Sequence, residues 1–303
     1  MRILLSGVAG MIASELCQQL HAQDHVIIGN DDLSHNCRLP QELPIQQMFT
    51  CSVLQLAYFE KALGEIDLII HCASPVGHAR LTPEAQIAWQ IVSDTQAMLE
   101  LAERKGARLI TFSSSEVLTY RGETDIRAQY SLGKLTSEAM VLGHLKVDAR
   151  VVRPYNVVGR HQKADGGFVM ARFRDAALHG QPLTIFGSGE QVRHFTHVSD
   201  FARFVLLLVE KWPGKKRWEV FVPENRTTIR DLALMFSKDR GQRAYLLESE
   251  ARAVLGNAQW RDTPERSLEL AEYIMCRGLG WHPQIKLEQI VREMLERVEA
   301  AGA

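Results

Sequence analysis

Short apolar runs alternate with amphipathic stretches along the first half of the chain. The apolar runs are rich in Val, Ile and Leu and predict strands near residues 2–6, 25–29, 45–49, 67–71, 108–113 and 149–153. Helical periodicity between them predicts helices near residues 11–22, 55–63, 84–104 and 130–147. Strands that are apolar on both faces are typical of a parallel sheet covered by helices on each side. The pattern therefore predicts a doubly wound α/β domain.

The second half of the chain has a looser pattern. It predicts helices near residues 167–179, 199–211, 228–238 and 286–300, an extended segment at 183–186 and a strand near 218–222. A chain of 303 residues is long enough for one large domain and a smaller one. We expect a nominal boundary near residue 160, with some later segments returning to the first sheet.

A glycine turn joins the first predicted strand to the first predicted helix. The sequence GVAGMIA at residues 7–13 allows backbone amides to approach a phosphate, which the positive end of the helix favours. Its spacing departs from the common Gly-x-Gly-x-x-Gly, and an ordinary strand-to-helix turn is the alternative. Asp31 follows the second strand, where a carboxylate accepts ribose hydroxyls and repels a 2'-phosphate. The sequence thus favours NAD, and Arg38 nearby leaves NADP open.

A tyrosine and a lysine stand four residues apart in the fourth predicted helix. Tyr130 and Lys134 fall on one helix face, so we expect the ammonium to lower the pKa of the phenol. A phenolate near neutral pH can take a hydroxyl proton while hydride leaves the same carbon. A hydroxyl of the nearby serine run at residues 113–115 can hold the substrate oxygen during that transfer. Without the other motifs, a surface helix pair would be the better explanation of this spacing.

Composition excludes several classes of function. The net charge of -1 and the absence of a basic run argue against nucleic acid as a partner. Five scattered cysteines without metal or redox spacing indicate reduced thiols in the cytoplasm. No apolar stretch is long enough for a membrane span, and a strand beginning at residue 2 leaves no room for a leader. His194 and His197 are expected to be structural, so we predict no metal site.

Five further motifs occur in order along the chain. They are HCASP at residues 71–75, FSSSEV at 112–117, RPYNVVG at 153–159, GSGEQVRHFTHVSD at 187–200 and LGWHP at 279–283. Together with the glycine turn and the Tyr-Lys pair, they resemble the extended short-chain dehydrogenase/reductase superfamily. The similarity is to its NAD-dependent branch of nucleotide-sugar epimerases, dehydratases and decarboxylases.

The resemblance implies a fold and a reaction. It implies a Rossmann NAD-binding domain over residues 1–160 and a smaller α/β substrate lobe over 161–303. A sugar hydroxyl would be oxidised transiently to a ketone, and epimerisation, decarboxylation or dehydration would follow. The substrate would be a nucleoside-diphosphate sugar. A homodimer would form through the helices at 84–104 and 130–147, whose alternative role is to face the core.

Individual residues receive roles from the same resemblance. The expected catalytic residues are Tyr130, Lys134, Ser114, with Ser115 as the alternative to Ser114, and Glu116. The expected cofactor-binding residues are Gly7, Gly10, Met11, Ile12, Asp31, Asp32, Ser52, Val53, Cys72, Ala73, Ser74, Tyr130 and Lys134. The expected substrate-binding residues are Asn156, Arg193, Arg261 and Arg266.

Local similarity favours UDP-glucuronate decarboxylases within the family. Glu116 completes a Ser-Ser-Glu sequence similar to theirs, although a solvated loop carboxylate is the alternative. Arg266, or Arg261 in its place, would lie near the sugar carboxylate, and Arg193 would bind the diphosphate. An epimerase outcome remains open.

Some positions depart from the family pattern. Leu118 and Thr119 replace a usual tyrosine and glycine, the loop at 118–129 is short, and Ile91 replaces a usual asparagine. Ser52 stands in a segment where a carboxylate is expected to bind adenine. These changes predict a divergent member. A non-catalytic dinucleotide-binding sensor or scaffold and a simple NAD(P)-dependent keto-sugar reductase are the alternatives, and a hydrolase lacks its Gly-x-Ser-x-Gly motif.

Overall fold

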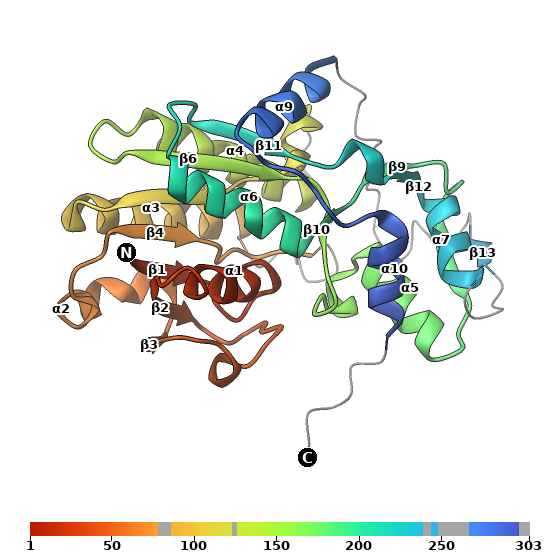
Figure 1. Ribbon diagram of the computed structural model, residues 1–303, viewed down its shortest axis with the longest axis horizontal. Helices are drawn as coiled ribbons and strands as arrows, with labels where there is room; N and C mark the ends of the chain where they lie inside the picture. Colours follow the sequence, from red (N-terminus) through yellow and green to blue (C-terminus); the bar gives the residue numbers. More distant parts are fainter. Residues whose placement is uncertain (78–85, 123–125, 239–243, 248–266, 297–303) are drawn as a thin grey trace.

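A seven-stranded parallel sheet forms the centre of the molecule (Figure 1). The computed structural model describes residues 1–77, 86–122, 126–238, 244–247 and 267–296. The strand order is β11-β6-β5-β4-β1-β2-β3, and every neighbouring pair is parallel. The strands are β1 (Arg2–Ser6), β2 (Val26–Asp31), β3 (Gln47–Thr50), β4 (Leu68–His71), β5 (Arg108–Phe112), β6 (Ala149–Pro154) and β11 (Arg217–Val220). The strand order reverses beside β1, which confirms the doubly wound prediction.

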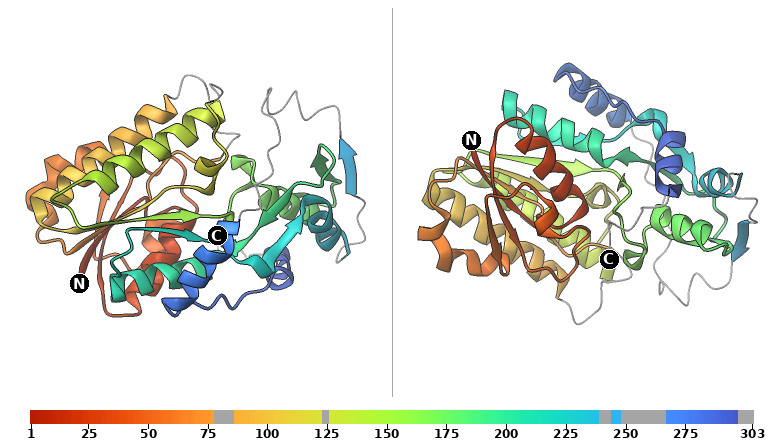
Figure 2. Two further views of the ribbon diagram at one scale, coloured as in Figure 1. Left: turned by 90° about the horizontal axis from the view of Figure 1, so that it is seen from above. Right: turned by 60° about the horizontal axis from the view of Figure 1, so that its bottom comes forward.

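Helices cover both faces of this sheet (Figures 1 and 2). One face carries α3 (Ile87–Lys105) and α4 (Ile126–Gly143), which pack against each other, with the short α2 (Glu60–Leu63) nearby. The other face carries α1 (Met11–His21) and α6 (Val198–Lys211). Each face has its own buried apolar cluster because every central strand is apolar on both sides.

A second apolar core lies beyond the carboxyl ends of the strands (Figure 1). Its elements are α5 (Val169–Leu178), β8 (Leu183–Phe186), α7 (Ile229–Lys238) and α10 (Leu287–Leu295). Short strand pairs complete this region: β7 (Val157–Val158) with β10 (Thr196–His197), β9 (Val192–His194) with β12 (Arg226–Thr228), and β8 with β13 (Ala244–Leu247). Not all of the later chain belongs to it, since α6, β11 and α9 (Ser267–Gly278) pack with the first sheet.

A buried network of charges fixes α4 to the sheet. Arg153 on β6 donates two hydrogen bonds to Glu138 on α4, at 2.7 and 2.6 Å. The same guanidinium donates to Glu219 on β11 at 2.9 Å, and the hydroxyl of Tyr155 donates to the other oxygen of Glu219. Glu138 is one helical turn after Lys134, so this network sets the position of the helix that carries the Tyr-Lys pair.

Most predicted elements are present with shifted ends. The six predicted strands of the first half agree within two residues at each end. The fourth helix is wrong by four residues at both ends, since α4 runs from 126 to 143 and Val147 then donates its amide to His144 Nδ1 in a turn. The predicted helix at 55–63 is a 3-10 segment, η2 (Val53–Phe59), followed by α2, because a capping box at Ser52 starts a tight turn. Among the described helices, none combines the length and apolarity that a bilayer crossing requires.

Candidate active site

A cavity of about 570 Å³ opens where the strand order reverses. Its floor is formed by residues directly after β1, β2, β4 and β5, and its walls come from α3, α4 and the second core. In doubly wound sheets, ligands bind at this carboxyl edge. The cavity is therefore the candidate active site.

The cavity wall contains every predicted site residue that the structure describes. These residues are Gly7, Gly10, Met11, Ile12, Asp31, Asp32, Ser52, Val53, Cys72, Ala73, Ser74, Ser114, Ser115, Glu116, Tyr130, Lys134, Asn156 and Arg193. Arg261 and Arg266 lie outside the described residues. Arg38 is not part of the wall and instead approaches Glu42, with 3.8 Å between Nε and the carboxylate. The residue that left NADP open therefore does not line the cavity.

The glycine turn is built for close approach. Gly7 has a φ of +68°, and a Cβ on it would lie 2.7 Å from the backbone nitrogen of Ala73. Only glycine fits this contact between the β1 turn and the end of β4. No side chain caps the amino end of α1, which begins after Gly10, so its first amides are available to a phosphate.

Asp31 ends β2 beside this turn. One carboxylate oxygen accepts from the Ala9 amide at 3.0 Å, and the other accepts from Leu33 at 2.8 Å. Burial raises the pKa of the Asp31 carboxyl, and the two backbone hydrogen bonds oppose that rise. A carboxylate retains further lone pairs for ribose hydroxyls.

Two serines contribute differently to the same cavity. Ser74 after β4 has a buried hydroxyl oxygen with no hydrogen-bond partner in the described structure. Such a group is expected where a bound ligand supplies the missing hydrogen bond. Ser52 instead caps η2, where its oxygen accepts from the Leu54 amide at 3.3 Å. The narrow turn at Gly7, the uncapped helix, Asp31 and Ser74 together fit NAD.

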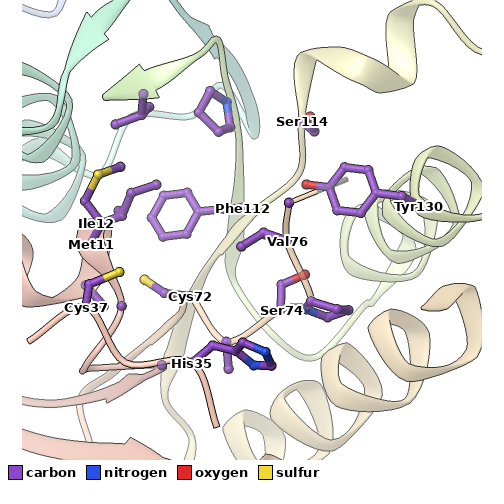
Figure 3. Close-up of a pocket in the computed structure, with 18 of the residues that line it drawn as sticks. Met11, Ile12, His35, Cys37, Cys72, Ser74, Val76, Phe112, Ser114 and Tyr130 are labelled. Carbon is purple, nitrogen blue, oxygen red and sulfur yellow. The ribbon is translucent and has the colours of Figure 1, made fainter. Parts of the chain in front are cut away.

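Tyr130 and Ser114 lie next to each other on one side of the cavity (Figure 3). The phenol forms a hydrogen bond with Ser114, which follows β5. Ser114 also begins a 3-10 turn, η4 (Ser115–Leu118), and its oxygen accepts from the Glu116 amide at 3.2 Å. This turn brings Glu116 to the cavity wall beside the phenol. A phenol, a serine hydroxyl and a carboxylate therefore meet at one place.

The expectation that Lys134 lowers the pKa of the phenol is wrong for this structure. Burial, followed by the charge of Glu116, raises the pKa of Tyr130, and the hydrogen bond with Ser114 opposes the rise. Lys134 Nζ donates to the carbonyl oxygen of Phe112 at 2.9 Å and lies 5.9 Å from the centroid of the Tyr130 ring. Burial also lowers the pKa of Lys134 to about 8. The lysine is directed at the floor of the cavity rather than at the phenol.

The candidate substrate residues lie on the side of the second core. Asn156 has a φ of +32°, and its side-chain amide donates to the carbonyl of His194 at 3.0 Å. Arg193 on β9 donates to the carbonyl of Val192 and also lines the cavity. β9 thus carries Arg193 and is hydrogen-bonded by Asn156, and both residues line the cavity.

Sequence reasoning missed one face of α3. Ile87, Gln90 and Asp94 all line the cavity, and their spacing of three and four places them on the same side of the helix. His35 and Cys37 from the loop after β2 also contribute to the wall (Figure 3). The helical spacing on α3 was the available signal, but an isolated aspartate in a helix gives no indication of burial.

The family model described as NAD dependent epimerase/dehydratase family matches residues 3–221. The chain belongs to this family. UDP-glucuronic acid decarboxylase 2 of Arabidopsis thaliana is 31% identical over 232 residues, which are 69% of this chain and 51% of the relative. The chain thus spans about half the length of that relative. UDP-glucuronic acid decarboxylase 1 of Danio rerio is 28% identical, with 97% of this chain and 72% of the relative covered.

Solved structures agree on the fold of this NAD-dependent family member. The UDP-glucose 4-epimerase of Thermotoga maritima superposes with a TM-score of 0.80 at 21% identity, with 97% of both chains covered. The UDP-glucuronic acid 4-epimerase of Bacillus cereus, solved with UDP-glucuronic acid and NAD, gives 0.79 at 23% identity over 97% of this chain and 98% of the other. The family assignment confirms the resemblance to nucleotide-sugar enzymes and the choice of NAD as cofactor.

Proposed function

We propose that this protein is an NAD-dependent nucleotide-sugar enzyme that oxidises a sugar hydroxyl transiently and decarboxylates UDP-glucuronate. The observation that carries the proposal is the meeting of Tyr130, Ser114 and Glu116 at one wall of the cavity that the glycine turn enters. The named decarboxylases from Arabidopsis thaliana and Danio rerio support this choice of outcome.

The proposed chemistry assigns each group one task. The glycine turn at Gly7, Asp31 and Ser74 would hold NAD, which would supply a hydride acceptor and donor for C4 of the sugar and a positive charge that favours the phenolate. Tyr130 takes the proton of the C4 hydroxyl while Ser114 hydrogen-bonds the same oxygen. The C4 ketone makes the sugar acid a β-keto acid, whose C5 carboxylate leaves as carbon dioxide. After carbon dioxide leaves, C5 receives a proton, and Glu116 is the candidate to transfer it.

The second core would hold the nucleotide end of the substrate. We place the substrate lobe at residues 161–303, apart from the segments α6, β11 and α9 that pack with the first sheet. Arg193 and Asn156 lie on its cavity side, where a guanidinium is suited to a diphosphate. Arg261 or Arg266 would contact the sugar carboxylate.

A mass-spectrometric product assay tests this function. Purified protein with added NAD would be given UDP-glucuronate and, in parallel, UDP-glucose. We expect UDP-glucuronate to lose carbon dioxide and UDP-glucose to remain unchanged. A product of unchanged mass but altered retention would identify an epimerase instead, and binding of NAD without any product would identify a non-catalytic binder.

The helices α3 and α4 support a further proposal, that the protein is a homodimer. Their outer surface carries exposed apolar side chains, with Trp89 62% exposed, Leu132 43% and Leu135 38%. Such side chains are typical of a contact between copies. Light scattering is expected to give twice the chain mass, and Trp89→Asp is expected to give the single chain mass. A wild-type protein that is monomeric at high concentration contradicts the proposal.

A further inference from the structure

Helix α3 places a buried carboxylate in the cavity wall that the proposed chemistry does not use. Asp94 is only 6% exposed and lines the cavity. In the described structure no hydrogen bond or ion pair involves its carboxylate, and the charges that act on it are those of Lys134 and Asp32. A buried carboxylate without a partner is costly in free energy. Because Asp94 lines a cavity, we infer that a bound ligand supplies the missing partner of its carboxylate.

Close packing of two helices sets the position of Asp94. A Cβ on Gly133 of α4 would lie 2.9 Å from the Cα of Ala88 on α3, so the helices approach closely beside Lys134. The hydroxyl of Ser137 on α4 also donates to the carbonyl of Ile91 at 3.4 Å. This contact brings Asp94 within electrostatic reach of Lys134. The floor of the cavity thus offers a hydrogen-bond acceptor and a donor near each other.

That pair matches the chemistry of a ribose diol. NAD contains two riboses, and Asp31 beside the glycine turn is suited to the one that carries adenine. The other ribose carries the reacting ring, which must come close to Tyr130, and Lys134 is one turn from Tyr130 on α4. We propose that Asp94 binds the hydroxyls of the nicotinamide-side ribose of NAD together with Lys134. This inference rests on the proposed use of NAD and adds a cofactor-binding residue to it.

The ionisation of Asp94 is consistent with this role. Burial raises its pKa to about 6, while the positive charge of Lys134 from α4 opposes the rise and Asp32 after β2 adds to it. His71 on β4 faces the same lysine, but burial lowers its pKa to about 3, so it stays neutral. Asp94 is therefore a carboxylate at pH 7.5, the form that accepts hydrogen bonds from hydroxyls.

The test compares three ligands by titration calorimetry at pH 7.5. NAD and ADP-ribose contain the second ribose, whereas ADP does not. Asp94→Asn is expected to weaken NAD and ADP-ribose by about tenfold or more, since a hydrogen bond to a charged group contributes about 1.5–3 kcal/mol. ADP affinity should change less than twofold. Asp31→Asn should weaken all three ligands, and Glu100→Gln, an exposed charge on the same helix, should weaken none.

A structural role would give a different pattern. If Asp94 only supported the fold, Asp94→Asn would lower the melting temperature or weaken ADP as much as NAD, and either result overturns the inference. An unchanged NAD affinity overturns it as well. If the variants show the expected pattern of ligand affinities but the wild-type protein converts no nucleotide sugar, only the proposed function is contradicted. Wild-type protein that fails to bind NAD would contradict both.

Discussion

Tyr130→Phe is expected to lower turnover of UDP-glucuronate by about a hundredfold to ten-thousandfold, which is the contribution of a positioned acid-base group. The variant keeps the partly buried ring but loses the hydroxyl that hydrogen-bonds Ser114. No other described group of the wall combines contact with Ser114 and a titratable hydroxyl, so the proton of the sugar would have no acceptor. NAD affinity should stay within a few-fold of wild type because the ring still fills its place. Product formation under saturating NAD and substrate measures the loss.

A second tyrosine supplies the control for this prediction. Tyr58 is 86% exposed and remote from the cavity wall, so Tyr58→Phe should retain full turnover. Both variants should melt within a few degrees of wild type. Turnover by Tyr130→Phe within threefold of wild type would show that another group takes the proton.

Glu138→Gln is expected to lower the free energy of unfolding by about 3–5 kcal/mol, because it leaves one partner of a buried ion pair without its counter-charge. Arg153 and Glu138 are 5% and 3% exposed and share two short hydrogen bonds. The amide has one acceptor oxygen, so it can accept only one of the two hydrogen bonds that the Glu138 carboxylate accepts from Arg153. Glu219 alone then remains to balance the positive charge of the guanidinium. Urea denaturation at pH 7.5 measures the change.

An exposed pair provides the matched comparison. Lys146 and Glu103 form an ion pair at 2.6 Å with side chains 74% and 36% exposed, so Lys146→Ala should leave the urea midpoint close to that of the wild type. Equal losses of stability toward urea in the two variants would mean that the buried network contributes no more to stability than a surface ion pair does. A large loss in Glu138→Gln alone would support its role in holding α4, and thereby Lys134, against the sheet.

The parts of the fold that the sequence predicted share a local cause. Buried parallel strands are continuous apolar runs, so β1 through β6 could be located within two residues. The glycine turn could be predicted because closely spaced glycines between an apolar run and a helical pattern are a local signal. Short strands such as β9 and β12 could not be predicted, since two or three residues show no periodicity.

The parts of the site that were missed depend on the tertiary structure. The spacing of Tyr130 and Lys134 predicted a shared helix face, but burial and Glu116 set the pKa of the phenol, and the Phe112 carbonyl fixes the lysine. Asp94 becomes a wall residue only because Gly133 lets the two helices approach. Burial and the contacts between distant segments decide such features, and neither is visible in a local sequence pattern.

Transient oxidation at C4 is the central claim, and the fate of the C4 hydrogen tests it most directly. UDP-glucuronate carrying deuterium at C4 would be incubated with the protein and a trace of NAD, and the product would be analysed by mass spectrometry while NADH absorbance is followed. We predict a decarboxylated product that keeps the deuterium through many turnovers per NAD, with no accumulation of NADH. One NADH formed for each product, loss of the deuterium from the product, or no conversion at all would contradict the claim.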